Sequence, residues 1–181
     1  ELTPIQAKSI PLILKGKDLV GQSSTGSGKT AAFAFPILQR LDLGNRKIQA
    51  LILCPTRELC TQVAREVRKL GRKQVGMQVL VLSGGMPMAP QLLSLKRGVH
   101  VVVGTPGRVL DHLGRNTLNF SQLATVVLDE ADRMLDMGFH EDIETILGAT
   151  PKTRQTVFFS ATFPNTIEAM SRAYQREPVH V

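Results

Sequence analysis

Cysteine is scarce in this sequence, which contains only Cys54 and Cys60 among its 181 residues. The two are too far apart for a C-x-x-C pair and no histidine cluster accompanies them, which argues against a zinc-type metal site. So few cysteines are typical of a reducing compartment. We therefore expect a cytoplasmic protein.

Long apolar runs are missing as well. No segment approaches the roughly 20 consecutive apolar residues that a membrane-spanning helix needs, so no membrane partner is expected. The start, ELTPIQ, lacks the basic and then apolar pattern of a signal peptide. Because the chain does not begin with Met, we interpret it as a piece of a longer protein. It shows no repeat or linker, and we expect residues 1–181 to form one monomeric domain.

Dense runs of a single charge are also absent, yet the net charge is +7 and the pI is about 9.9. A basic balance favours a polyanionic partner, since each Lys or Arg placed on a phosphate releases condensed counterions. A basic balance also keeps many proteins soluble. Charge alone therefore leaves both interpretations open.

Short apolar runs alternate with stretches of helical period along the whole chain. The six strand candidates are DLVGQ, QALILCP, QVLVLSGG, VHVVVGTP, TVVLDE and TVFFSAT. The predicted helices are Thr3–Leu14, Lys29–Leu41, Arg57–Leu70, Ala89–Lys96, Pro106–Leu113, a stretch after Asp129, and Pro164–Tyr174. This alternation predicts a doubly wound α/β domain, with a parallel β-sheet flanked by helices on both faces.

The segments directly after the six strands are polar or rich in glycine: SSTGSGKT, PTREL, SGG, TPGR, DEAD and SAT. In an open parallel sheet, ligands bind at the carboxyl ends of the strands, so these segments should share one rim. Structural turns also use glycine and proline. Turns alone do not require Lys29, Arg57, Arg108, Asp129 and Glu130, so we expect this rim to be the functional site.

The segment STGSGKT lies between a predicted strand and an apolar helix, the context of a phosphate-binding loop. The general pattern has glycine at the position of Ser23, and this sequence does not. Backbone N–H groups of the loop would surround phosphate oxygens, Lys29 would reach the outer phosphates and the Thr30 hydroxyl would ligate Mg²⁺. The candidate nucleotide-binding residues of this loop are Ser23, Ser24, Thr25, Gly26, Ser27, Gly28, Lys29 and Thr30.

A carboxylate pair follows the buried strand of ATVVLDEAD. Asp129 is placed to complete a magnesium site, and Glu130 to orient and deprotonate an attacking water, with Lys29 as the third catalytic candidate. The structural alternative is an acidic first turn that favours a helix dipole. No Asn-Lys-x-Asp guanine pattern occurs, so ATP is the expected nucleotide. By local physics, Thr3 to Gln6 is a helix start with a capping box.

Taken in order, the six rim segments resemble the first RecA-like domain of the DEAD-box ATP-dependent RNA helicases, over nearly the whole chain. Phrases such as LCPTREL, TPGRVLDHL and DEADRMLDMGF are most similar to bacterial members that act on large-subunit ribosomal RNA. The resemblance implies a RecA-like P-loop NTPase fold. It also implies that Gln6, with Thr3 and Pro4, reads adenine through its side-chain amide. Family members usually carry Ala at the position of Ser23.

The resemblance further implies an RNA-backbone surface and a coupling motif. The matching RNA-contact residues are Pro55, Thr56, Arg57, Gly84, Gly85, Thr105, Pro106, Gly107 and Arg108. For each segment the structural alternative is a capped helix start. The helix through Val109 to Leu113 resembles the wedge that bends the bound strand. Ser160 and Thr162 match the motif that couples hydrolysis to strand separation, with Asp132 as a hydrogen-bond partner.

The implied activity is RNA-stimulated ATP hydrolysis coupled to strand bending and local duplex unwinding. The family's second RecA-like domain, which supplies arginine fingers, is an expected partner, so we expect this chain by itself to be nearly inactive. Two alternatives stay open at this point. One is an ATP-latched RNA clamp or assembly scaffold with incidental unwinding, and the other is a DNA-directed translocase.

Overall fold

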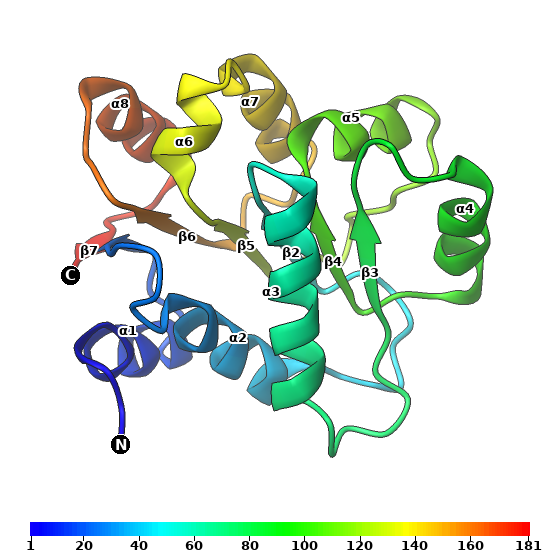
Figure 1. The fold of residues 1–181 in the computed structure, drawn as a ribbon, viewed down its shortest axis with the longest axis horizontal. Coiled ribbons are helices and arrows are strands. Elements are labelled where there is room, and N and C mark those ends of the chain that lie inside the picture. Colours follow the sequence, from blue (N-terminus) through cyan, green and yellow to red (C-terminus); the bar gives the residue numbers. More distant parts are fainter.

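The computed structural model describes residues 1–181, which form one seven-stranded sheet with helices on both faces (Figure 1). All strand pairs are parallel, and the order across the sheet is β3-β4-β2-β5-β6-β1-β7. The strands are β1 (Leu19–Gln22), β2 (Ala50–Leu53), β3 (Val79–Leu82), β4 (Val101–Gly104), β5 (Thr125–Leu128), β6 (Gln155–Ser160) and β7 (Val179–His180). The predicted doubly wound α/β fold is confirmed.

Eight helices connect these strands: α1 (Pro4–Leu14), α2 (Lys29–Arg40), α3 (Arg57–Leu70), α4 (Met88–Arg97), α5 (Pro106–Gly114), α6 (Ala131–Asp136), α7 (His140–Gly148) and α8 (Asn165–Tyr174). Side chains of α1, α2 and α3 form one apolar cluster with one face of the sheet. Side chains of α5, α6, α7 and α8 form a second cluster with the other face. Figure 1 shows these helices on the opposite side of the sheet from α1, α2 and α3. No helix has both the length and the apolar character needed to cross a membrane.

The central strands β2, β4 and β5 are buried at every position. Helices cover both of their faces, which explains why they are continuous Val, Leu and Ile runs and do not alternate with polar residues. Gly21 in β1 is required by packing, because a Cβ there would lie 2.5 Å from the Phe159 ring of β6. The sheet core is thus close-packed between two helical layers.

Two features differ from the elements expected from the sequence. The stretch after Asp129 forms two helices, α6 and α7, separated at Gly138, whose φ of 88° lies in the left-handed region that ends helices. The chain end also adds a seventh strand, β7, which pairs with β1. We expected no strand there, because two residues carry no periodic pattern.

Many arginines lie at the amino edge of the sheet, where helices end and their last carbonyls lack helical partners. Arg40 Nη2 donates to the carbonyls of Ile13 and Leu14 at 2.6 Å each. Arg154 donates to the Tyr174 carbonyl at 2.9 Å. These arginines satisfy helix ends, so part of the excess positive charge has a structural purpose.

Candidate nucleotide and nucleic-acid site

The loop between β1 and α2 begins at Ser23 and ends with Gly28 as the N-cap of α2. Gly26 and Gly28 have φ values of 82° and 85°, which residues with a Cβ rarely adopt. The Ser23 amide donates to the Ser160 carbonyl of the neighbouring strand at 3.1 Å. The Ser23 hydroxyl is buried without a hydrogen-bond partner, so the serine adds no such bond to the loop.

Lys29 and the carboxylate pair, a hundred residues apart in sequence, meet in the structure. Lys29 Nζ lies 3.0 Å from Asp129 Oδ1 and 3.6 Å from Glu130 Oε1. The first contact is buried, since the two side chains are 7% and 0% exposed. The sheet order explains the meeting, because only β6 separates β1 from β5.

Asp129 is a buried carboxylate whose environment favours a cation. Burial raises its pKa, and the nearby Lys29 ammonium partly opposes that change. Neither carboxylate oxygen receives a hydrogen bond with satisfactory angles, despite the short distance to Lys29. A buried, poorly satisfied carboxylate oxygen is a fitting Mg²⁺ ligand.

Glu130 adopts a left-handed backbone conformation, with φ 54°, directly before α6. Its Oε1 accepts a hydrogen bond from the Thr25 hydroxyl at 3.2 Å, and its Oε2 lies 3.3 Å from Arg133 Nη1. Thr25 therefore connects the phosphate-binding loop to this carboxylate. The strained backbone is held by its surroundings and aims the side chain at the loop.

The start of α1 connects the predicted adenine-reading residue to the same loop. The side-chain oxygen Oε1 of Gln6 accepts from the backbone N–H of Thr3 at 3.0 Å, and the Thr3 hydroxyl accepts from the backbone N–H of Gln6 at 3.4 Å. These two bonds complete the predicted capping box. Gln6 Nε2 also donates to the Gly28 carbonyl at 3.0 Å. A Cβ on Gly28 would lie 2.6 Å from Gln6 Nε2, so only glycine allows this contact.

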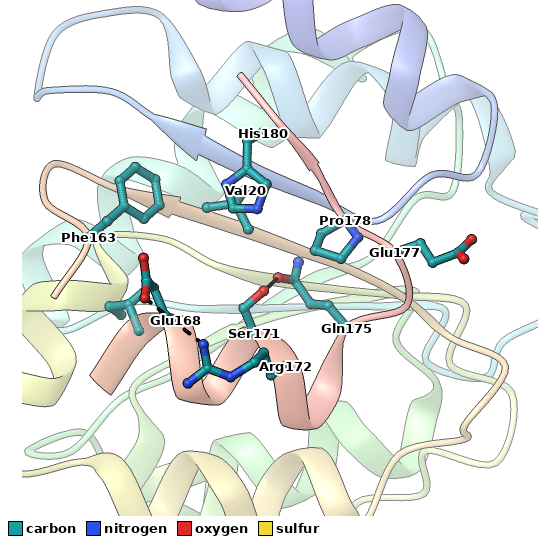
Figure 2. Close-up of a pocket in the computed structure, with 10 residues that line it drawn as sticks. Val20, Phe163, Glu168, Ser171, Arg172, Gln175, Glu177, Pro178 and His180 are labelled. Atoms are coloured by element: carbon teal, nitrogen blue, oxygen red, sulfur yellow. Dashed lines mark hydrogen bonds and ion pairs between the residues drawn. The ribbon is translucent and has the colours of Figure 1, made fainter. Parts of the chain in front are cut away.

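A cavity of about 240 Å³ opens beside these groups. Its lining includes Gln6, Gly28, Lys29, Asp129 and Glu130. It also includes three residues of α3: Leu59, from the PTREL segment, and Gln62 and Glu66, which the sequence did not suggest. A larger cavity of about 660 Å³ lies between α8 and the β7 segment (Figure 2). That cavity contains none of the predicted site residues, and the chemistry of the smaller one makes it the candidate nucleotide site.

No group of three or more His, Cys, Asp or Glu residues forms a metal cage. This suits Mg²⁺, which usually takes one or two protein oxygens and completes its shell with phosphates and waters. Thr30 lies in the first turn of α2, and Asp129 lines the same cavity. The residues present therefore fit a magnesium ion held together with a nucleotide.

The predicted RNA-contact residues follow three adjacent strands, β3, β4 and β2. Thr56 is the N-cap of α3 and accepts from the Leu59 amide at 3.2 Å, whereas the Thr105 side chain caps nothing. A Cβ on Gly85 would lie 3.5 Å from Arg57 Nη1, so two of these segments touch. Pro55 and Pro106 are buried, and the glycines Gly84, Gly85 and Gly107 are exposed.

The predicted coupling residues are also in contact. Asp132 Oδ2 accepts from the Thr162 hydroxyl at 2.9 Å and from the Thr162 amide at 3.2 Å. The Ser160 hydroxyl donates to the Thr162 carbonyl at 2.7 Å and accepts from the Asp132 amide at 3.2 Å. Burial alone would raise the Asp132 pKa, but the hydrogen bond from Thr162 and others outweigh it and lower the pKa.

Comparisons with known proteins agree with this geometry. The family model described as DEAD/DEAH box helicase matches residues 3–170. The DEAD-box ATP-dependent RNA helicase CshA of Bacillus cereus is 49% identical over 181 residues, covering 100% of this chain and 34% of that protein. The ATP-dependent RNA helicase DbpA of Escherichia coli is 49% identical over 180 residues, which are 99% of this chain and 39% of its own length.

A solved structure is similar as well. The crystal structure of a DEAD box protein from the hyperthermophile Methanococcus jannaschii superposes with a TM-score of 0.95 at 43% identity, covering 99% of this chain and 49% of that one. The chain thus spans about a third to a half of the length of these relatives. The RecA-like fold is confirmed, and the chain belongs to the DEAD/DEAH box helicase family.

Proposed function

We propose that this chain is the ATP-binding half of an ATP-dependent RNA helicase core. The observation that carries the proposal is the meeting of three side chains beside the phosphate-binding loop. Lys29 Nζ lies 3.0 Å from Asp129 Oδ1 and 3.6 Å from Glu130 Oε1. A loop alone would support nucleotide binding. The added carboxylate pair supports hydrolysis.

Gln6 is suited to recognise adenine because only part of its hydrogen-bonding capacity is used. Its Oε1 accepts one bond, from Thr3, and its Nε2 donates one, to Gly28. One lone pair and one N–H therefore stay free to pair with the N6 donor and N7 acceptor of adenine. Guanine presents an acceptor in place of the N6 donor, so the same amide favours ATP.

The hydrolytic step divides the work among the rim residues. Lys29 binds the outer phosphates, and Thr30 with Asp129 would hold Mg²⁺, which neutralises charge developing on the phosphates. Glu130 takes a proton from the attacking water as the water oxygen bonds to the γ-phosphorus and the bond to the β-phosphate oxygen breaks. The hydrogen bond from Thr25 orients Glu130 for this step.

RNA would lie across the ends of β3, β4 and β2, with its sugar and phosphate groups on Thr56, Arg57, Thr105 and Arg108 and on the exposed glycines. Such contacts position a strand and carry little base information. We therefore expect this surface to bind RNA with little base specificity. The nucleotide half of the rim would be coupled to the RNA half by the hydrogen-bond network of Asp132, Ser160 and Thr162. This network follows β5 and β6.

Turnover requires a partner domain in this proposal. The relatives are two to three times longer than this chain, which leaves room for a second RecA-like domain. An arginine finger supplied by such a domain is worth about 10³ to 10⁵ in rate. We therefore expect the single domain, which we take to be a cytoplasmic monomer by itself, to bind ATP and hydrolyse it very slowly.

The test is Glu130→Gln in a protein that carries both RecA-like domains. We expect ATP and RNA binding to be retained and RNA-stimulated phosphate release to be lost, whereas the exposed Glu168→Gln control should match the wild type. Unchanged turnover in Glu130→Gln would refute the hydrolytic assignment. A strand-displacement assay on the wild type tests the clamp alternative, which long-lived ATP-dependent RNA binding without duplex opening would favour. Comparing the stimulation of ATP hydrolysis by RNA and by DNA tests the DNA-translocase alternative, and equal stimulation would count against an RNA helicase.

A further inference from the structure

The guanidinium group of Arg108, in the first turn of α5, is held at one nitrogen. Its Nη1 donates to the Met86 carbonyl at 3.0 Å and to Gln91 Oε1 at 3.1 Å. Arg108 takes part in none of the ion pairs of the structure, and its other nitrogens donate to no protein acceptor. The free Nε and Nη2 form the planar edge of the guanidinium that binds two oxygens of one phosphate.

Gln91 lies in α4 and is 5% exposed. Besides Arg108, its Oε1 contacts His112 Nε2 at 2.9 Å. Arg108 and His112 are four residues apart, so they lie on the same side of α5, and Gln91 bridges α4 to that side. Because a guanidinium can only donate, the amide oxygen of Gln91 has to face Arg108.

His112 completes the arrangement. It is fully buried, and its Nδ1 lies 2.7 Å from the Thr117 hydroxyl. Burial, followed by the charge of Arg108, lowers the His112 pKa. A neutral imidazole with its proton on Nε2 would donate to Gln91 Oε1 and accept from the Thr117 hydroxyl at Nδ1. In that tautomer, Arg108 and His112 both donate to the one amide oxygen of Gln91.

The glutamine at this position has both a cost and a benefit for folding stability. The Nε2 of Gln91 is buried without a hydrogen-bond partner. Such an unsatisfied donor costs about 1 to 3 kcal/mol. An apolar side chain of similar length would remove that cost but would leave the buried His112 Nε2 without its acceptor.

We propose that Gln91 is a positioning residue for RNA binding, which holds Arg108 by Nη1 so that the Nε and Nη2 edge faces a phosphate of the RNA backbone. The inference rests on the proposed function, because it requires Arg108 to contact RNA. Met86 provides the second anchor from the loop after β3, next to Gly85. This role was not predicted from the sequence, since Gln91 belongs to none of the rim segments.

The test compares Gln91→Met with Arg108→Ala and with the double variant, using fluorescence anisotropy of a labelled single-stranded RNA over a range of salt concentrations. We expect Gln91→Met to weaken RNA binding about 3- to 10-fold, the equivalent of one hydrogen bond. We also expect the slope of log affinity against log salt to become shallower, by at most about 0.7 for one lost phosphate contact. Adding Gln91→Met to Arg108→Ala should weaken binding no further.

Two controls separate this role from a structural one. Gln74→Met alters another glutamine with one buried, unpartnered amide atom, far from the rim in the α3 to β3 connection, and should leave RNA binding unchanged. Gln91→Glu keeps an acceptor for Arg108 but adds a charge that competes with phosphate, so it should weaken RNA binding at least as much as Gln91→Met. It also serves as the test variant if Gln91→Met fails to fold.

The outcomes distinguish the inference from the proposed function. If Arg108→Ala weakens RNA binding and Gln91→Met changes neither affinity nor salt slope, the inference is overturned and the proposed function stands. Equal losses from Gln91→Met in the wild-type and Arg108→Ala backgrounds would overturn it as well, because the glutamine would then act independently of Arg108. If Arg108→Ala itself has no effect, the RNA assignment of Arg108 fails and the inference fails with it.

Discussion

Replacing Gln6 with alanine tests the adenine-recognition proposal most directly. The side chain makes two hydrogen bonds within the protein, from the Thr3 amide to Oε1 and from Nε2 to the Gly28 carbonyl. At about 0.5 to 1.5 kcal/mol each, their loss should lower the free energy of unfolding by about 1 to 3 kcal/mol. Urea denaturation measures this change.

The same substitution removes both proposed bonds to adenine. Two bonds of that strength correspond to about 1 to 3 kcal/mol of binding free energy, or a 5- to 150-fold weaker affinity for ATP. GTP cannot form the N6 bond, so its affinity should change less and the preference for ATP over GTP should shrink. Competition with a fluorescent nucleotide gives both dissociation constants.

Thr3→Ala is the matched control. It removes the N-cap oxygen that accepts from the backbone N–H of Gln6, which should cost about 1 kcal/mol of stability. The side-chain amide of Gln6 stays in place. It should therefore destabilise the protein while keeping the preference for ATP. If Gln6→Ala also keeps the wild-type ratio of ATP to GTP affinity, adenine is not read by Gln6 and the reasoning is refuted.

Four further substitutions test other parts of the structure. Ser23→Ala removes a buried hydroxyl without a partner, so it should leave ATP affinity unchanged in a nucleotide titration and raise the unfolding free energy by up to about 1 kcal/mol; weaker ATP binding would contradict this. The Asp132 pKa is lowered in the folded protein, so its ionised form stabilises the fold above its ordinary pKa of 3.8, and that contribution is lost as the pH falls through the lower folded pKa. In urea titrations at acidic pH, the unfolding free energy of Asp132→Asn should therefore change less with pH than that of the wild type. The same pH dependence in both proteins would count against the Thr162 contact. Gly104→Ala places a Cβ 2.6 Å from Val109 and 2.9 Å from the Leu82 carbonyl and should cost about 1 to 3 kcal/mol by urea denaturation, whereas Gly107→Ala, with no atom within 4 Å, should not destabilise the fold.

Local patterns in the sequence were sufficient to predict most elements of the fold. The six long strand candidates are continuous apolar runs, and the glycines and prolines that follow them mark turns, so their identity does not depend on distant residues. β7 was missed because its two residues are defined only by their pairing with β1. The break at Gly138 depends on one backbone angle, which a helical periodicity does not reveal.

The strand order was the information that the sequence could not supply. It divides the rim into two halves: the candidate nucleotide and coupling segments follow β5, β6 and β1, and the candidate RNA segments follow β3, β4 and β2. Short motifs indicate which residues carry chemistry but not which strands are neighbours. The support given by Gln91 to Arg108 depends on a hydrogen bond between α4 and α5, so it too required the three-dimensional structure.

The arginines at the amino edge of the sheet have a consequence for how such a protein can adapt to temperature. Arg40 and Arg154 satisfy helix ends on the side of the sheet opposite the candidate site. Substitutions there act on the unfolding equilibrium without touching the groups proposed to handle ATP or RNA. We therefore expect mutations at these arginines to change the melting temperature with little effect on turnover.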